Sequence, residues 1–124
     1  KKENYALDWS KTAIALHNQI RGFYPNCTAT FRDRALKILA TVPLDAAYTL
    51  QLSPEVQQLV HNFPNLSSDR RPGEIVQIIK GVGAAIQTGA GLLLLREVQP
   101  AGKRPQSGWD FVNGNRLTVG EVFL

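Results

Sequence analysis

The sequence predicts a mainly β domain with short helices, built as an OB-like five-stranded β-barrel with an N-terminal helix and a short C-terminal helix. The first observation is a set of five short segments in which apolar or β-branched residues alternate or run on, each bounded by turn-forming residues. The second is one long connection after the second segment, and the third is a helical pattern near each end. A five-stranded OB-like barrel fits this order best, and strand counting alone leaves an SH3-like barrel or a small sandwich open.

The N-terminal helix is expected over residues 10–22, where apolar residues recur every three or four positions. Asp8 or Ser10 is expected to cap its start, and Gly22 to take the left-handed position after its end.

Five strands and a short closing strand are expected between the two helices and at the C-terminus. A turn at Asp33 and Arg34 joins the first two strands, and a hairpin turn at Gly89 to Gly91 joins the last two, because glycine adopts positive φ without penalty. Residues 92–95 are apolar at successive positions, so both faces of that strand are expected to be covered. The strands are expected over residues 27–32, 35–42, 74–80, 84–88 and 92–98, and the closing strand over residues 119–123.

The chain of 124 residues has the length of one domain. Residues 1–8 are expected to be the remnant of an interdomain linker, and residues 9–124 to form the OB-like domain. Residues 43–72 have the composition of an insertion with one helix, which Ser53 caps and Pro54 begins.

The net charge of +4 is unevenly distributed along the chain. Residues 1–40 hold seven basic and three acidic side chains, residues 41–69 none and three, and residues 70–124 seven and four. This segregation favours a polyanionic partner, with a plain solubilising surface charge as the alternative. The longest apolar run, residues 92–95, is too short to cross a membrane, and a single cysteine fits a reducing cytoplasm.

The residue types that carry catalysis or bind metals are few and scattered. His17, His61 and Cys27 lack the short spacings of zinc ligands, so no metal site is predicted. Cys27 is expected to be a buried structural thiol and His17 a packed histidine on the apolar stripe of its helix. The glycine-rich residues 80–91 lack the Lys-Ser or Lys-Thr that closes a P-loop, and a strand follows them. No catalytic residue is predicted.

The most informative stretch is residues 99–117, QPAGKRPQSGWDFVNGNRL. A basic, proline-bounded turn leads into a short helix, in which Ser107 is expected to cap the start and Gly114 to close the end. Trp109 and Phe111 on this helix either stack on bases or anchor it to the barrel, and anchoring is the favoured interpretation.

Exposed cations are the remaining functional candidates, and they are expected to position a nucleic acid by contacting its phosphates, without reading its sequence. For any single one of them, a solvated surface charge is the alternative. The candidates are Lys103, Arg104, Arg116, Arg96, Lys80, Lys37, Arg34, Arg32 and Arg21.

Two stretches carry a family resemblance. Gln99-Pro100, Gly102-Lys103, Asp110-Phe111 and Asn113-Gly114 with Arg116 form a series that resembles the C-terminal domain of the methionyl-tRNA formyltransferase family. Residues 7–25, LDWSKTAIALHNQIRGFYP, resemble the segment that joins the catalytic domain to this domain. Sugar-nucleotide and folate-dehydrogenase relatives share this front motif. The chain departs from the family at residues 26–28, where many relatives continue with tryptophan, proline and glycine.

The resemblance implies an OB-like fold and a non-catalytic, tRNA-binding role. The parent enzymes formylate the amino group of initiator Met-tRNA with 10-formyltetrahydrofolate, which their N-terminal catalytic domain binds. No cofactor is therefore expected in this chain, and the chain is expected to be inactive alone. Initiator Met-tRNA and the catalytic domain of the same protein are the expected partners, with no membrane and no DNA.

Two alternatives remain. One is an accessory packing or assembly domain of a small-molecule (sugar-nucleotide) formyltransferase that binds no nucleic acid. The other is a free-standing interaction module whose N-terminal helix docks on a partner.

Overall fold

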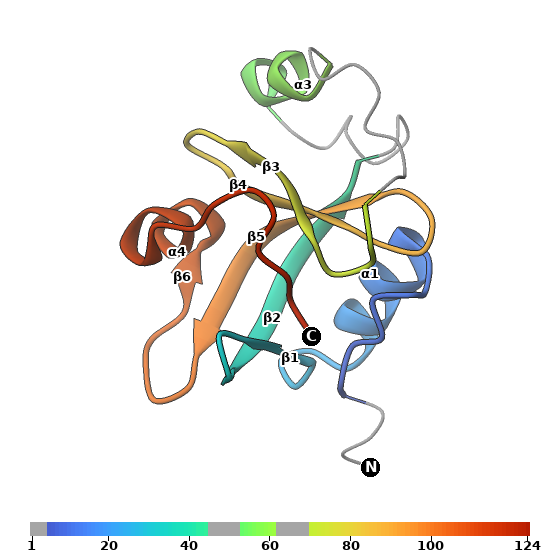
Figure 1. Ribbon diagram of the computed structural model, residues 1–124, viewed down its shortest axis with the longest axis vertical. Helices are drawn as coiled ribbons and strands as arrows, with labels where there is room; N and C mark the ends of the chain where they lie inside the picture. Colours follow the sequence, from blue (N-terminus) through green and yellow to red (C-terminus); the bar gives the residue numbers. More distant parts are fainter. Residues whose placement is uncertain (1–4, 45–52, 62–69) are drawn as a thin grey trace.

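The computed structural model describes residues 5–44, 53–61 and 70–124 (Figure 1). Within these ranges the strands form one antiparallel sheet in the order β1-β2-β5-β4-β3, and a sixth, two-residue strand pairs with β5. The mainly β class with a helix at each end is thereby confirmed, and β6 is a short strand that was not expected. The strands are β1 (Thr28–Phe31), β2 (Arg34–Pro43), β3 (Ile75–Ile79), β4 (Gly83–Gln87), β5 (Leu92–Pro100) and β6 (Gln106–Ser107).

The turn between β1 and β2 has two residues, as expected, but lies one residue earlier. Phe31 pairs with Arg34, so Arg32 and Asp33 are the two turn residues, with φ of 51° and 64°. Positive φ at both positions is the geometry of a type I′ turn, which matches the twist of the flanking strands. Arg34, expected in the turn, is instead the first residue of β2.

The N-terminal helix, α1 (Ala13–Gly22), packs against β2 and β5. The expected cap was wrong, because Thr12 caps the helix by accepting a hydrogen bond from the Ala15 N–H at 3.0 Å. The carboxylate of Asp8 instead accepts from the backbone N–H and the hydroxyl of Ser10, at 3.0 and 2.6 Å. These bonds close a local turn ahead of the helix.

The C-terminal helix, α4 (Gly108–Asn115), begins as expected, since the Ser107 hydroxyl accepts from the Asp110 N–H at 3.0 Å. Its end was wrongly predicted: Gly114 lies within the helix, and Arg116 takes the left-handed position with φ of 51°. The chain leaves the helix there because the buried Leu117 donates its N–H back to Val112 at 3.0 Å. The end of α1 was also wrongly predicted. Gly22 is the last residue of this helix and Phe23 is its C-cap.

The C-terminal tail forms a single bridge, Glu74 with Val122, and not the expected closing strand. The tail nevertheless bonds to both edge strands of the sheet. The Ile75 N–H donates to the carbonyl of Glu121 at 2.8 Å, and Thr30 and Leu124 exchange backbone hydrogen bonds at 2.9 and 2.8 Å. The tail therefore links β3 to β1.

The apolar strand β5 is covered on both faces, as predicted. Leu92, Leu93, Leu94 and Leu95 are all buried. Leu93 and Leu95 belong to the main core, which α1, α4 and Phe123 complete. Leu94 faces a smaller cluster on the other side of the sheet. Burial on both faces makes β5 the central strand of the fold.

The described part of the predicted insertion contains the expected helix, α3 (Pro54–His61), which begins at Pro54. Residues 45–52 and 62–69 of the insertion, and residues 1–4 of the expected linker, lie outside the described residues. The boundaries of both segments stay predictions.

Candidate nucleic-acid interface

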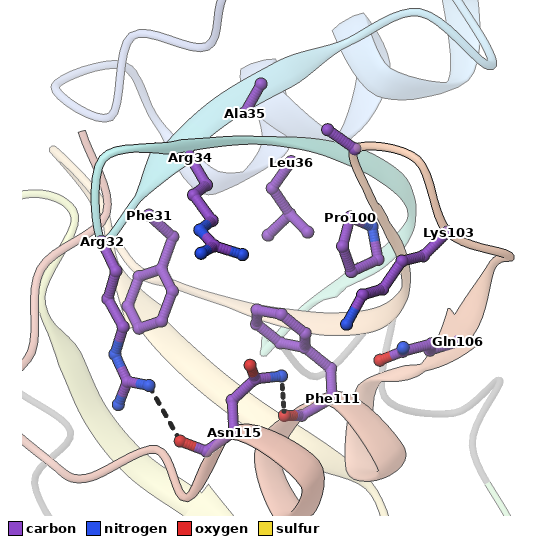
Figure 2. A pocket seen from close by; sticks show the side chains of 11 residues that line it. Phe31, Arg32, Arg34, Ala35, Leu36, Pro100, Lys103, Gln106, Phe111 and Asn115 are labelled. Carbon is purple, nitrogen blue, oxygen red and sulfur yellow. Dashed lines mark hydrogen bonds between the residues drawn. The ribbon is translucent and has the colours of Figure 1, made fainter.

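A cavity of about 700 Å³ lies between the β1–β2 turn, the loop that joins β5 to β6, and α4 (Figure 2). Arg34 and Lys103 extend their nitrogen atoms into it from opposite walls. Phe31 and Phe111 supply an aromatic floor, with ring centroids 5.9 Å apart. The cavity therefore combines two facing cations with an apolar base.

Strand geometry positions Arg34. It directly follows the tight turn and pairs with Phe31 across the hairpin. Arg34 and Leu36 share one face of β2 because side chains alternate along a strand. Leu36 is buried at the base of this face and Arg34 is exposed at its end, so the guanidinium reaches the mouth of the cavity.

A hydrogen-bonded turn positions Lys103. Its N–H donates to the carbonyl of Pro100 at 3.0 Å, and its own carbonyl accepts from Gln99 Nε2 at 2.9 Å. Gly102 has φ of 74°, which this turn requires. The Ala101 N–H also donates to a β2 carbonyl at 3.3 Å. The backbone beneath Lys103 is therefore fixed relative to β2.

Arg32 also lines the cavity, but its charge is already paired. Its guanidinium donates to both carboxylate oxygens of Glu121, at 2.8 and 2.9 Å, and to the carbonyl of Asn115 at 2.9 Å. The hydrogen bond from Arg32 is the main cause that lowers the pKa of Glu121. The structure thus separates Arg32 from the other candidate cations.

A smaller hollow of about 180 Å³ adjoins the cavity and is lined by Lys37. Ala35, Pro100 and Ala101 line both spaces and form the ridge between them. Lys37 pairs with Gln99 across β2 and β5. Three predicted cations therefore gather at this end of the sheet, namely Arg34, Lys103 and Lys37.

The other predicted cations do not line either hollow. Arg104 follows Lys103 in the same loop and Arg116 follows α4, whereas Lys80 lies at the end of β3, Arg96 on β5 and Arg21 in α1. All nine candidate cations are exposed, and Arg32 differs from the other eight by its ion pair. Among the described residues, the ion pairs are those of Arg32 with Glu121 and of Arg70 with Glu74, so none of these eight cations is paired with a described carboxylate.

No described group is arranged for bond making. Cys27 is buried, as predicted, and burial raises the pKa of its thiol. His17 is also buried, as predicted, and hydrogen-bonds to Thr41 at 3.0 Å. Burial, and then the charge of Arg21, lower the pKa of His17. Across the described residues, no three potential metal-ligating side chains cluster, and no helix is both long and apolar enough to span a bilayer. The cavity presents two cations above an aromatic floor.

Several cavity residues were missed by sequence reasoning. Phe31 was placed only as the apolar side of a strand, and nothing local marked Gln106 or Asn115. Trp109 and Phe111 pack against the main core, which supports the anchoring interpretation, although Phe111 also reaches the cavity.

Comparison with known proteins places the chain among formyltransferases. The family model described as "Formyl transferase, C-terminal domain" matches residues 1–116. The chain is 66% identical to the methionyl-tRNA formyltransferase of Trichormus variabilis over 123 residues, which are 98% of this chain and 37% of that protein. It is 65% identical to the methionyl-tRNA formyltransferase of Nostoc sp., covering 98% of this chain and 36% of that protein. The chain thus spans little more than a third of these curated relatives.

A solved structure supports the fold alone. A multiply substituted variant of HypX from Aquifex aeolicus superposes with a TM-score of 0.64 at 10% identity, over 98% of this chain and 18% of that one. The family model covers nearly the whole chain, and the relatives are far more similar than fold likeness requires. The chain belongs to the formyl transferase C-terminal domain family.

Proposed function

We propose that this domain is a non-catalytic tRNA-binding module that positions initiator Met-tRNA for N-formylation. The observation that carries the proposal is the pair of exposed, unpaired cations, Arg34 and Lys103, that face each other across the cavity, with Lys37 in the adjoining hollow. Such a cluster attracts a polyanion, and each phosphate bound releases condensed counterions. The aromatic floor lies where a ribose or base next to that phosphate would rest.

In this proposal the chemistry belongs to an N-terminal catalytic domain of the same protein, which holds 10-formyltetrahydrofolate. The domain described here lowers the entropic cost of bringing the amino group of Met-tRNA to that site, and it leaves the chemical step unchanged. The names of the curated relatives support this assignment. The same proposal includes closure of the sheet into an OB-like barrel, in which the tail joins the two edge strands. It also includes a cytoplasmic location and a role in translation initiation.

The alternative of a packing domain in a small-molecule formyltransferase is not favoured. Such a domain needs no facing pair of unpaired cations, and the relatives at 66% and 65% identity are named for methionyl-tRNA.

The test is a salt titration of labelled initiator tRNA with the 124-residue chain and two double variants. Arg34→Glu with Lys103→Glu removes the facing pair. Lys11→Glu with Arg71→Glu is the matched control, because it changes the net charge equally at exposed residues outside both hollows. Loss of two phosphate contacts should reduce the slope of log K against log salt by about 2, while the control slope stays near that of the wild type.

Two outcomes contradict the proposal. If both double variants weaken binding equally with equal slopes, the effect is one of net charge and the grip lies elsewhere. If the wild-type chain binds neither tRNA nor the sugar-nucleotide control at low salt, the packing-domain alternative is favoured.

A further inference from the structure

We infer that Arg32 is a positioning residue of the cavity: it holds the cationic wall and the aromatic floor at a fixed separation and does not itself bind phosphate. This inference rests on the proposed function, since it concerns the same cavity. It begins from an anomaly in the turn. Type I′ positions favour asparagine or glycine, yet here Arg32 and Asp33 carry φ of 51° and 64°. The hydrogen bonds of the Arg32 side chain can offset the cost of this backbone conformation.

The contacts of Arg32 join three segments that are remote in sequence. Nε and one terminal nitrogen of the guanidinium form a bidentate pair with Glu121, 89 residues away, at 2.8 and 2.9 Å. The other terminal nitrogen donates to the carbonyl of Asn115 at 2.9 Å, at the exposed end of α4 (Figure 2). One side chain thus ties the β1–β2 turn to the tail and to α4.

We call Arg32 and its hydrogen bonds to Glu121 and Asn115 the brace. Glu121 is itself held in place by further contacts. Its carboxylate also accepts from the backbone N–H of Thr118 at 2.8 Å, so it closes the turn that leads into the tail. Beyond it, Phe123 stacks on Phe31 with centroids 4.4 Å apart, and Leu124 bonds to Thr30. The tail is therefore fixed on β1 at Thr30 and Phe31, the two residues that precede Arg32.

The brace acts on the binding residues through the backbone. Arg34 follows Arg32 by two residues on one wall, and α4 carries Phe111 and Asn115 on the other. The guanidinium of Arg32 lies 5.1 Å from the centroid of the Phe31 ring, which also fixes the edge of the floor. Since Glu121 neutralises Arg32, the charge of Arg32 adds little to phosphate attraction, and what it contributes is geometry.

The test compares two charge-conserving variants, Arg32→Lys and Arg70→Lys. Lysine keeps the charge but cannot bond to a carboxylate in bidentate fashion and to a carbonyl together. Arg70 is the matched control, because it is the other described arginine paired with a glutamate, at 2.7 Å, and lies outside the cavity. Arg32→Lys should weaken tRNA binding about two- to fivefold, the range that an exposed ion pair supports, with an unchanged salt slope. Arg70→Lys should bind as the wild type does.

Glu121→Gln tests the brace separately, because the two explanations predict opposite changes in tRNA affinity. It makes the chain more positive, so electrostatics alone predicts tighter binding, whereas loss of the brace predicts weaker binding. Glu74→Gln, which breaks the other pair with the same charge change, is its control. Circular dichroism at the assay temperature establishes that each variant is folded, so a change in affinity is not a loss of folded protein.

The outcomes separate the brace from the proposed function. Tighter binding with a steeper slope in Glu121→Gln, or wild-type affinity in Arg32→Lys, overturns the brace and leaves the tRNA grip standing. If the wild type binds no tRNA, the proposed function fails, and amide hydrogen exchange still tests the brace. Arg32→Lys should then speed exchange at Leu117 and Leu124 by severalfold relative to Arg70→Lys, and equal exchange would overturn the inference.

Discussion

Two glycines on α4 predict opposite effects of the same substitution. A Cβ at Gly108 would collide with the carbonyl oxygen of Leu95 and would lie 3.0 Å from that of Val82. Both are backbone atoms, one in β5 and one in the turn between β3 and β4, so they cannot rotate away as a side chain could, and α4 would have to shift. Overpacking of this kind destabilises a protein by about 1–3 kcal/mol. Gly108→Ala should therefore lower the free energy of unfolding by that amount.

Gly114→Ala on the same helix is the matched control. No heavy atom lies within 4 Å of a Cβ built at Gly114, and the residue is helical. Alanine there should stabilise the domain by about 0.5–1 kcal/mol, because it loses less backbone entropy on folding. The two variants should differ by about 2–4 kcal/mol in unfolding free energy, which corresponds to a Tm difference of roughly 6–16 °C for a domain of this size.

Urea denaturation of the two variants, followed by tRNA titration, measures both consequences. Because α4 carries Phe111 and Asn115, the shift caused by Gly108→Ala should also weaken tRNA binding, and Gly114→Ala should leave it unchanged. An unfolding free energy for Gly108→Ala within about 0.5 kcal/mol of the wild type would refute the reasoning, because a surface substitution does no more. It would mean that α4 does not rest on β5 as closely as described.

Two further predictions concern the core. Because the pKa of His17 is lowered in the folded state, the unfolded chain binds more protons than the folded chain just below pH 6.5, and stability should fall as the pH drops below about 6.5. His17→Gln should flatten this pH dependence in urea titrations from pH 7.5 to 5. An unchanged pH dependence would assign the effect to another group. Phe123 is 1% exposed and stacks on Phe31, so Phe123→Ala should cost about 3–5 kcal/mol in urea denaturation; a loss below about 1 kcal/mol would show that the tail does not complete the core.

The sequence predicts the elements of this fold well where their cause is local. The hairpin between β4 and β5, the Ser107 cap and the two-sided apolar run of β5 each depend on residues within a few positions, and the structure confirms all three. Of the two hairpin glycines, Gly91 takes the expected positive φ. The cap of α1 and the turn before β2 were misplaced by only a few residues, whereas two other failures depend on how the chain packs. The end of α4 is set by where Leu117 is buried, and the tail forms no strand because it bonds to two different edges, at Ile75 and Thr30.

The candidate site was predictable in its charge but not in its assembly. The basic turn at Lys103 is visible in the sequence, whereas its facing partner, Arg34, comes from the other end of the chain. The bond from Ala101 to β2 and the pairing of β2 with β5 bring the two together. Gln106 and Asn115 have no local signal, because an amide becomes a cavity residue only through the packing of α4.

Arg32 shows why counting cations overestimates a binding surface. By composition it is equivalent to Arg34, two residues away, and both line the same cavity. The difference between them is Glu121, which neutralises one and leaves the other free, and no local pattern could reveal a partner 89 residues distant. Under the proposed function, Arg34 would attract a phosphate, whereas the paired charge of Arg32 would act only through the geometry that it holds. A count of cations therefore predicts the strength of such a surface only after the paired cations have been removed from it.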